Sequence, residues 1–282
     1  MKTIKDILLH ATNLLHQTSS SPRLDSELLL SHCLSKSRTY FFTYPEQALT
    51  SAEHKQMQSL LEERVKGTPI AYMTGQKEFW SLMLKVTTDT LIPRPETELL
   101  VETALTALEG IKNPVIIELG TGSGAIAIAL ASERSDSTIY ASDISEKALT
   151  IAKHNAQTHQ IKNISFMYSN WLTDYPNIKA DLIISNPPYI AHNCPLIETN
   201  VKNHEPSLAL FSNENGYHDL LTIIEQSKYY LRRQGTILLE HGINQEGTLA
   251  KILNKHGFIS FKNHADLQGI NRCVDAKYLH SE

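Results

Sequence analysis

The sequence has few of the features that mark secreted or metal-binding proteins. Only three cysteines occur in 282 residues; Cys33, Cys194 and Cys273 lie far apart and form no CxxC pair. Neither a disulfide framework nor a zinc site is therefore indicated, and a reducing cytoplasm is the expected compartment. The thirteen histidines include no HExxH motif and no tight cluster, so we expect no bound metal.

Long apolar runs and an excess of positive charge are also missing. No stretch approaches the roughly 20 apolar residues that span a bilayer, and Asp6 and His10 interrupt any signal-like apolar core at the N-terminus. The formal net charge of −4 argues against a protein that wraps duplex nucleic acid. We therefore expect no membrane association and no stable nucleic-acid partner.

The remaining composition is that of an ordinary globular protein, with 41% hydrophobic and 20% charged residues. The length favours one large domain with a smaller one attached. Helical spacing of apolar residues predicts that the smaller domain lies first. We assign residues 1–77 to this helical domain, which is either a docking domain for a substrate, the interpretation we adopt, or a plain helical bundle. Its expected helices cover 4–15 (apolar at Ile4, Ile7, Leu8, Ala11, Leu14 and Leu15), 24–34 (apolar at Leu24, Leu28, Leu29 and Cys33) and 51–65, with Ser51 as N-cap.

The helical spacing of apolar residues then gives way to an alternating pattern, and we assign residues 78–95 to a β-hairpin linker. Glu78–Val86 and Thr87–Ile92 alternate enough to predict its two strands. The adjacent aromatics Phe79 and Trp80 either face a ligand or pack at the domain junction. Pro95 then suits the start of a helix over about 96–108.

Residues 96–282 alternate between β-rich runs and amphipathic helices, which predicts an α/β domain with a Rossmann-like parallel sheet and right-handed crossovers. The domain as a whole is our candidate catalytic domain. The expected helices after 96–108 cover about 125–131, 146–157, 217–231 and 245–256. The expected strands are 114–119, 138–143, 164–168, 182–185, 236–240, 258–263 and 273–278.

A glycine-rich loop follows the first of these strands. Strand, glycine turn and helix together bring a backbone close to a nucleotide-like ligand. The spacing is GxGxG, whereas the dinucleotide-binding fingerprint is GxGxxG. An acidic residue precedes the loop, and an acid at this position suits a cationic ligand better than a phosphate. S-adenosylmethionine is such a ligand, and an NAD-type dehydrogenase is disfavoured. The candidate cofactor-binding residues here are Glu118, Gly120, Thr121, Gly122, Ser123 and Gly124.

Two further residues at strand ends are candidates for the same ligand. Asp143 lies about 20 residues beyond Gly124, where an acid at the end of the second strand bonds ribose hydroxyls. It can also cap the next helix, and the two roles are compatible. Trp171 follows the third strand and can pack on adenine, or it can be a core or lid tryptophan.

The most specific stretch is Asn186-Pro187-Pro188-Tyr189, directly after the buried strand 182–185. The prolines end the strand and hold the backbone rigid. The Asn186 carbonyl oxygen and a main-chain carbonyl beside it can accept both hydrogens of a planar –NH2 group, while the Tyr189 ring covers it. This arrangement catalyses by positioning and electrostatics. The alternative is a proline turn that only caps the strand. The loop of about 191–215 that follows has the length of a substrate-covering segment.

With the glycine loop, Asp143 and the Asn-Pro-Pro-Tyr motif in register, the chain resembles the class I S-adenosylmethionine-dependent methyltransferases. The runs TPIAYMTGQKEFWSLMLKVTTDTLIPRPETELLVE, ELGTGSGAIAIALA, SNPPYI, HEPSLAL and LLEHG narrow the resemblance to the release-factor glutamine methyltransferases, the PrmC/HemK family. It covers essentially the whole chain. The stretch Asp266–Arg272 is looser than the usual form in that family.

The resemblance implies methyl transfer to the glutamine of the Gly-Gly-Gln motif in class I peptide-chain release factors, with S-adenosylhomocysteine as product. It implies that Gly120–Gly124, Asp143, Trp171 and Asn186 line the cofactor site, and that Asn186 and the Pro187 carbonyl hold the amide while Pro188 and Tyr189 lie around the glutamine chain. We expect a monomer. The alternatives are an adenine amino-group methyltransferase acting on nucleic acid and a non-catalytic S-adenosylmethionine-binding module.

Overall fold

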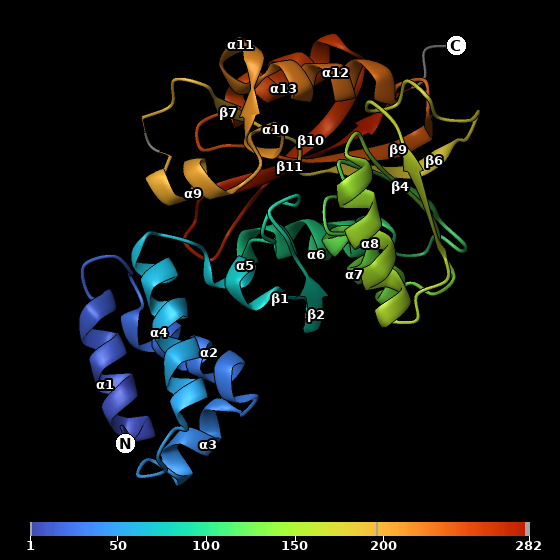
Figure 1. The fold of residues 1–282 in the computed structure, drawn as a ribbon. Helices are drawn as coiled ribbons and strands as arrows, with labels where there is room; N and C mark the ends of the chain where they lie inside the picture. The colour runs from blue at the N-terminus through green and yellow to red at the C-terminus, as the bar shows by residue number, and fades with distance from the viewer. Residues whose placement is uncertain (1, 196, 280–282) are drawn as a thin grey trace. The chain divides into compact units, whose positions relative to one another are not determined.

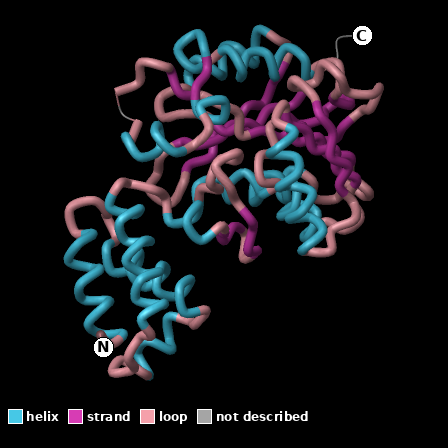
Figure 2. Tube along the Cα trace, viewed as in Figure 1, coloured by secondary structure: helices cyan, strands magenta, loops and turns pink. Residues whose placement is uncertain are grey.

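The computed structural model describes residues 2–195 and 197–279 (Figures 1 and 2). The chain divides into two compact units. The smaller unit consists of Met1–Gln76 together with Thr199–His204, and the larger consists of Lys77–Glu198 and Glu205–Glu282. None of the helices within the described ranges is both long and apolar enough to cross a membrane.

The smaller unit is built mainly of helices and has a core of its own. Two of its helices begin with reciprocal capping boxes, Thr3 with Asp6 and Thr50 with Glu53, so the longest helix is capped by Thr50 rather than by the predicted Ser51. The short helices α3 and α5 were not predicted, because a single turn carries no periodicity. Its helices are α1 (Ile4–Leu15), α2 (Pro22–Leu34), α3 (Arg38–Thr43), α4 (Ser51–Val65), α5 (Ile70–Thr74) and α9 (Thr199–His204).

The buried face of α2 differs from the one predicted. Leu29 and Leu30 are buried as expected of apolar residues, whereas Leu24 is 39% exposed. Asp25 and Glu27 lie on the buried side instead. Asp25 accepts a hydrogen bond from Arg64 at 2.8 Å, and Glu27 pairs with Arg23 and Arg38 at 2.6 Å each. Buried carboxylates persist when they are paired, and this pairing rotates the helix away from its purely apolar face. Leu14 of α1 is likewise 44% exposed.

The β-hairpin is shorter than predicted and lies earlier in the chain. Both strands, β1 (Gln76–Phe79) and β2 (Leu82–Lys85), fall before residue 87, so the second predicted strand, 87–92, is wrong. Trp80 and Ser81 have φ angles of 53° and 57°, the left-handed pair of a tight type I′ turn. Residues 87–90 form a turn of their own, closed by a 3.0 Å bond from the Thr90 N–H to the Thr87 carbonyl.

The larger unit is built on a mostly parallel sheet, which has seven strands among the described residues. Its order is β10-β11-β9-β6-β3-β4-β5. The five strands from β9 to β5 run parallel, and β11 and β10 complete the sheet in antiparallel pairing. The strands are β3 (Val115–Leu119), β4 (Thr138–Asp143), β5 (Ile164–Tyr168), β6 (Ala180–Ser185), β9 (Leu231–Glu240), β10 (Phe258–Ala265) and β11 (Asn271–Tyr278).

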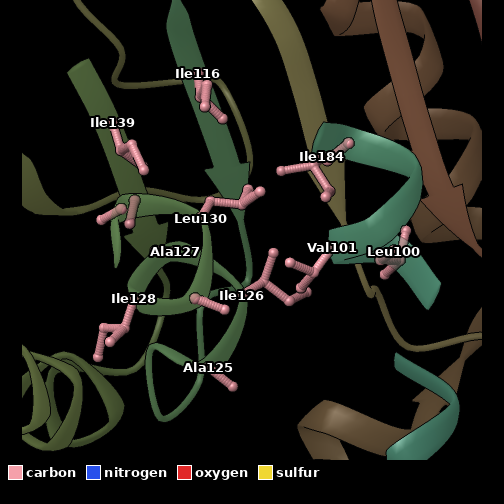
Figure 3. Close-up of a cluster of buried hydrophobic side chains, with 14 of the residues drawn as sticks. Leu100, Val101, Ile116, Ala125, Ile126, Ala127, Ile128, Leu130, Ile139 and Ile184 are labelled. Carbon is pink, nitrogen blue, oxygen red and sulfur yellow. The ribbon is translucent and has the colours of Figure 1, made fainter. Parts of the chain in front are cut away.

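Both faces of this sheet are covered, so its central strands are apolar on both sides. Ile116 and Ile184 pack with α6, α7 and α8, while Ile117 and Ile183, their chain neighbours, pack with α12 and α13 on the other face. Figure 3 shows Ile126 of α7 beside Val101 of α6, in the cluster that also contains Ile116 and Ile184. The helices are η1 (Pro95–Thr97), α6 (Glu98–Ala107), α7 (Ala125–Glu133), α8 (Glu146–Thr158), α12 (His218–Ser227) and α13 (Glu246–Lys255).

The predicted loop 191–215 is partly ordered into short elements. Two residues of β7 (Ile190–Ala191) pair in parallel with β8 (Phe211–Ser212), which closes the segment at its base. Between them lie α9 and α10 (Ser207–Leu210), and α11 (Asn213–Gly216) follows. The helix predicted to reach residue 231 ends at Ser227, because Leu231 already begins β9.

Candidate active site

A cavity of about 200 Å³ opens within the larger unit at the carboxyl ends of β3, β4, β5 and β6. This is the edge of a parallel sheet where ligands of such folds bind. Six predicted site residues line it: Gly120, Gly122, Asp143, Trp171, Asn186 and Pro188. The other lining residues are Asp89, Thr90, Leu91, Ile144, Ser145, Ala148, Ser169, Asn170, Pro206, Leu208, Ala209, Phe211 and Asp219.

The glycine loop presents bare backbone to the cavity. Gly122 has a φ of 57°, and a Cβ added there would meet no atom within 4 Å, so the space beside it is open. Gly124 has a φ of 85°, and a Cβ there would lie 2.9 Å from Cδ1 of Ile128 and 3.2 Å from Cβ of Ala152. The first glycine therefore leaves room for a ligand, while the second lets the loop pack closely on the helices behind it.

Asp143 ties the glycine loop to the end of β4. Its Oδ2 accepts the Gly122 N–H at 2.8 Å and its Oδ1 accepts the Ser145 N–H at 2.9 Å. Burial raises the pKa of Asp143 above its ordinary value, and these backbone hydrogen bonds oppose the rise. A carboxylate has about four acceptor positions, and the backbone N–H groups of Gly122, Ile144 and Ser145 leave acceptor capacity for a hydroxyl group of a ligand in the cavity.

Glu118 lies behind the loop and is not among the lining residues. Its carboxyl is buried and accepts a 2.6 Å hydrogen bond from the Thr121 hydroxyl. Burial raises the pKa of Glu118 to about 8, and the nearby Asp143 adds to the rise while the bond from Thr121 opposes it. Thr121 and Ser123 are buried, and the Ser123 carbonyl accepts from Asn155 Nδ2 at 2.8 Å, so both residues shape the loop.

Trp171 forms one wall of the cavity beside the glycine loop. A Cβ on Gly120 would lie 3.5 Å from Cζ3 of the indole, so the ring packs against the loop at this glycine. The indole Nε1 donates to Asp219 Oδ1 at 3.2 Å, which fixes the plane of the ring. Asp219 was not predicted, because an acid in the first turn of a helix is common and carries no signal by itself.

Asn186 lies directly after β6 and lines the cavity. Its side-chain Nδ2 donates to Thr97 Oγ1 at 3.2 Å. The other end of the amide, the oxygen Oδ1, is then the end left to accept hydrogens from a ligand. The remaining residues of the motif are placed differently, since Pro187 is buried and Pro188 lines the cavity.

Tyr189 is not among the lining residues, and its hydroxyl donates to Glu240 Oε1 at 3.1 Å. Burial raises the pKa of Tyr189, and the Glu240 carboxyl raises it further. Burial also raises the pKa of Glu240, to about 7. The tyrosine ring packs with the cluster that holds α12 and α13, so the motif extends from the cavity into the core behind it.

Another part of the cavity lining comes from the segment after the motif, through Pro206, Leu208, Ala209 and Phe211. Glu205 anchors this segment: its carboxylate forms an ion pair with Arg94 and also accepts the Ile92 N–H at 3.2 Å. Phe79, in contrast, is buried in the core, and the Trp80 indole donates to Glu133 at 2.8 Å. Neither aromatic lines the cavity.

No group of three or more histidine, cysteine or acidic side chains suited to a metal ion occurs in residues 2–195 and 197–279. The groups that the cavity presents are backbone, amide and carboxyl groups and aromatic rings.

Comparison with known proteins identifies the family to which this site belongs. A family model described as the PrmC N-terminal domain matches residues 6–75, and one described as the methyltransferase small domain matches residues 95–203. A release factor glutamine methyltransferase of Coxiella burnetii is 43% identical over 277 residues, which cover 98% of this chain and 99% of that protein. The chain belongs to the release factor glutamine methyltransferase family.

Two further members support this assignment. The release factor glutamine methyltransferase of Aliivibrio fischeri is 41% identical over 93% of this chain and 92% of its own length. That of Escherichia coli is 45% identical over 81% of this chain and 82% of its own length. The predicted resemblance to this family is thus confirmed, and the chain is a methyltransferase rather than a dehydrogenase.

Solved structures confirm the class I methyltransferase fold. The hMettl16 catalytic domain, determined with the MAT2A 3′UTR hairpin 6, matches with a TM-score of 0.57 at 16% identity, over 76% of this chain and 81% of that one. A methyltransferase from Pyrococcus furiosus matches with a TM-score of 0.53 at 16% identity, over 71% of this chain and 90% of that one. At 16% identity, these two structures show the fold of the present chain and say nothing about its substrate.

Proposed function

We propose that this chain transfers the methyl group of S-adenosylmethionine to the side-chain amide nitrogen of the glutamine in the Gly-Gly-Gln motif of class I peptide-chain release factors. The observation that carries the proposal is the orientation of Asn186, whose Nδ2 is bonded to Thr97 while the residue lines the cavity next to the glycine loop. The Asn186 side-chain oxygen, a hydrogen-bond acceptor, thereby lies in the same cavity as the glycine loop. The names of the full-length relatives supply the substrate.

The cavity fits S-adenosylmethionine as cofactor. The open space beside Gly122 admits the amino-acid part of the ligand close to backbone, and the remaining acceptor capacity of Asp143 suits a ribose hydroxyl. The Trp171 ring offers an apolar face for adenine. Glu118 and the loop residues Gly120, Thr121, Ser123 and Gly124 form the supporting shell of the same site.

When bound, S-adenosylmethionine supplies a methyl group already activated by its sulfonium. Asn186 Oδ1 and the Pro187 carbonyl each accept one hydrogen of the glutamine –NH2, which turns the nitrogen lone pair towards the cofactor side of the cavity. An amide nitrogen is a weak nucleophile, and two acceptors in the amide plane raise its electron density. The nitrogen proton becomes acidic only after transfer and then passes to solvent, with S-adenosylhomocysteine as the leaving group, so the chain needs no general base. Pro188 and Tyr189 keep the motif rigid around the glutamine.

We assign the remaining roles by the same proposal. Residues 1–77 act as the substrate-docking domain, 78–95 as the hairpin linker and 96–282 as the catalytic domain. The enzyme acts as a monomer in the cytoplasm, where release factors are found, with no membrane or stable nucleic-acid partner.

The decisive experiment uses labelled S-adenosylmethionine with a purified class I release factor and with the same factor carrying alanine in place of the Gly-Gly-Gln glutamine. The proposal predicts label on the first and none on the second. Label on both, or on neither, would overturn it. A parallel reaction with adenine-containing DNA and RNA, without release factor, serves as the control for the alternative substrate class.

A further inference from the structure

The orientation of the Asn186 side chain is an open physical question for any enzyme that uses it as an acceptor. The two ends of an amide are nearly equal in size, and a rotation of 180° would direct a donor instead of an acceptor at the substrate. The proposed chemistry requires Oδ1, and not Nδ2, on the side of the glutamine –NH2. Something in the protein must therefore distinguish the two orientations.

Thr97 is the residue that does so. Its Oγ1 accepts the Asn186 Nδ2 hydrogen at 3.2 Å, although the two residues are 89 positions apart in the chain. Thr97 is only 4% exposed, so water does not compete for this contact. It stands at the N-cap position of α6, yet its side chain makes no capping hydrogen bond there. The ordinary structural role of a threonine at this position is thus not the one it has.

A hydroxyl can donate as well as accept, and a freely rotating Thr97 would accept either orientation of Asn186. The neighbouring carboxyl of Glu240 bears on this choice. Its carboxyl is buried, and its Oε2 has no partner of normal hydrogen-bond geometry within the described residues. The Thr97 hydroxyl is near enough to lower the pKa of Glu240 against the effect of burial. In the structure Thr97 Oγ1 is the acceptor of the Asn186 Nδ2 hydrogen, and the buried Glu240 carboxyl is an acceptor towards which the Thr97 proton can turn.

The same carboxyl holds the far end of the motif, since the Tyr189 hydroxyl donates to Glu240 Oε1 at 3.1 Å. Glu240 ends β9, the strand next to β6, so the contact joins two neighbouring strand ends. Asn186 with Thr97 and Tyr189 with Glu240 thus form two hydrogen-bonded pairs at these strand ends. Only Asn186 of these four lines the cavity.

We propose that Thr97, by accepting the Asn186 Nδ2 hydrogen, is a positioning residue that locks the Asn186 amide with its oxygen towards the substrate. The need for an acceptor at Asn186 rests on the proposed function, whereas the orientation of the Asn186 amide rests on its contact with Thr97 alone. Thr97 touches neither substrate nor cofactor and acts only through Asn186.

The test is a double-mutant cycle between Thr97→Val and Asn186→Ala, measured as single-turnover methyl transfer to release factor. Valine keeps the shape of threonine and removes the hydroxyl. We expect Thr97→Val to slow transfer about tenfold, or about 1.4 kcal/mol, without change in the dissociation constant of S-adenosylmethionine. In the Asn186→Ala background the same change should have no further effect, because its target is gone. Thr97→Ser, which keeps the hydroxyl, should restore most of the rate.

The matched control is Thr103→Val, which removes another buried hydroxyl from α6, away from the motif, and should leave the rate unchanged. Equal losses from Thr97→Val with and without Asn186 would reduce Thr97 to a structural residue and overturn the proposal. So would a wild-type rate in Thr97→Val.

A readout without substrate separates this inference from the proposed function. The side-chain amide resonance of Asn186, assigned by its loss in Asn186→Ala, should shift in Thr97→Val and stay in Thr97→Ser. If the wild-type enzyme methylates no release factor but the resonance shifts as expected, the proposed function fails and the positioning stands. If Thr97→Val leaves the Asn186 resonance unchanged, the proposed positioning role of Thr97 is wrong, whatever the activity of the enzyme.

Discussion

The strand ends of β3 and β4 are held by a different kind of contact from those of β6 and β9. At the first pair, a side chain is fixed by backbone: both Asp143 oxygens accept main-chain N–H groups. At the second pair, side chains fix one another, Asn186 through Thr97 and Tyr189 through Glu240. The first arrangement suits a shape that must fit a whole cofactor. The second suits a single amide that must present its oxygen, and not its nitrogen, to the substrate.

This difference predicts a division of effects. Changes at the β3 and β4 ends should weaken cofactor binding, whereas changes at the β6 and β9 ends should slow methyl transfer and leave cofactor binding intact. The following experiments are arranged from the largest expected effect to the smallest.

Asn186→Ala should have the largest effect on catalysis. Loss of an oriented polar contact to the reacting group costs on the order of 2–4 kcal/mol in the transition state. We expect this loss in kcat/KM for release factor, with a much smaller change in the dissociation constant of S-adenosylmethionine measured by calorimetry. An active Asn186→Ala enzyme, or one that has lost cofactor binding to the same degree, would break the division between the two ends.

Arg94→Gln tests the wall that completes the cavity from the motif side. The Glu205 side chain is 1% exposed, so removal of Arg94 takes the ion-pair partner from a buried carboxylate that still accepts the Ile92 N–H. Breaking a buried pair costs several kcal/mol, and because Arg94 is 34% exposed we expect about 2 kcal/mol in the free energy of unfolding. Denaturant titration measures it. The exposed pair Lys147–Asp89 is the control, since Lys147→Gln should cost less than about 0.5 kcal/mol.

Gly122→Ala tests the cofactor end. Its φ of 57° costs an alanine about 1–2 kcal/mol, and the methyl group would occupy the open space that we assign to the ligand. We expect the dissociation constant of S-adenosylmethionine to rise at least about tenfold, with a normal transfer rate once the enzyme is saturated. Gly110→Ala, at a φ of 76° with equally open surroundings outside the cavity, reproduces the strain alone. If both variants bind cofactor equally well, the open space beside Gly122 is not part of the site.

Glu118 should make cofactor binding depend on pH. Its carboxyl titrates near pH 8 in the folded protein against an ordinary 4.5. A protonated Glu118 offers no charge to the cationic cofactor, so affinity should rise as pH increases from about 6.5 towards 9. The stability of the ligand-free protein runs the opposite way: the contribution of Glu118 is fully present below pH 4.5 and declines as pH rises through about 8. Calorimetry of Glu118→Gln should show a flatter pH profile of affinity; an unchanged profile would exclude Glu118 as its source.

The site could be predicted from the sequence where a functional residue directly follows a recognisable strand. The glycine loop, Asp143 and Asn186 each follow a strand directly, and a parallel sheet brings such strand ends together, so their common cavity could be predicted. The strands β4 and β5 have the predicted bounds for the same reason, since each is a short β-rich run between turn residues.

What could not be predicted depends on pairs far apart in the chain. Asn186 and Thr97 are 89 positions apart, Trp171 and Asp219 are 48 apart, and Glu205 and Arg94 are 111 apart. Nothing in the local pattern of a threonine or an acid reveals such a partner. The rotated face of α2 has the same origin, because Asp25 is held on the buried side by Arg64, 39 positions away.

The most direct test of the central claim asks which atom receives the methyl group. Release factor whose glutamine side-chain amides carry ¹⁵N is methylated with S-adenosylmethionine carrying a ¹³C-methyl group, and the product is examined by NMR. The proposed mechanism predicts a methyl resonance with one-bond coupling between ¹³C and ¹⁵N, which disappears when the Gly-Gly-Gln glutamine is replaced by alanine. A ¹³C-methyl signal without that coupling would place the methyl group on another atom and contradict the roles of Asn186 and Thr97 in orienting the amide.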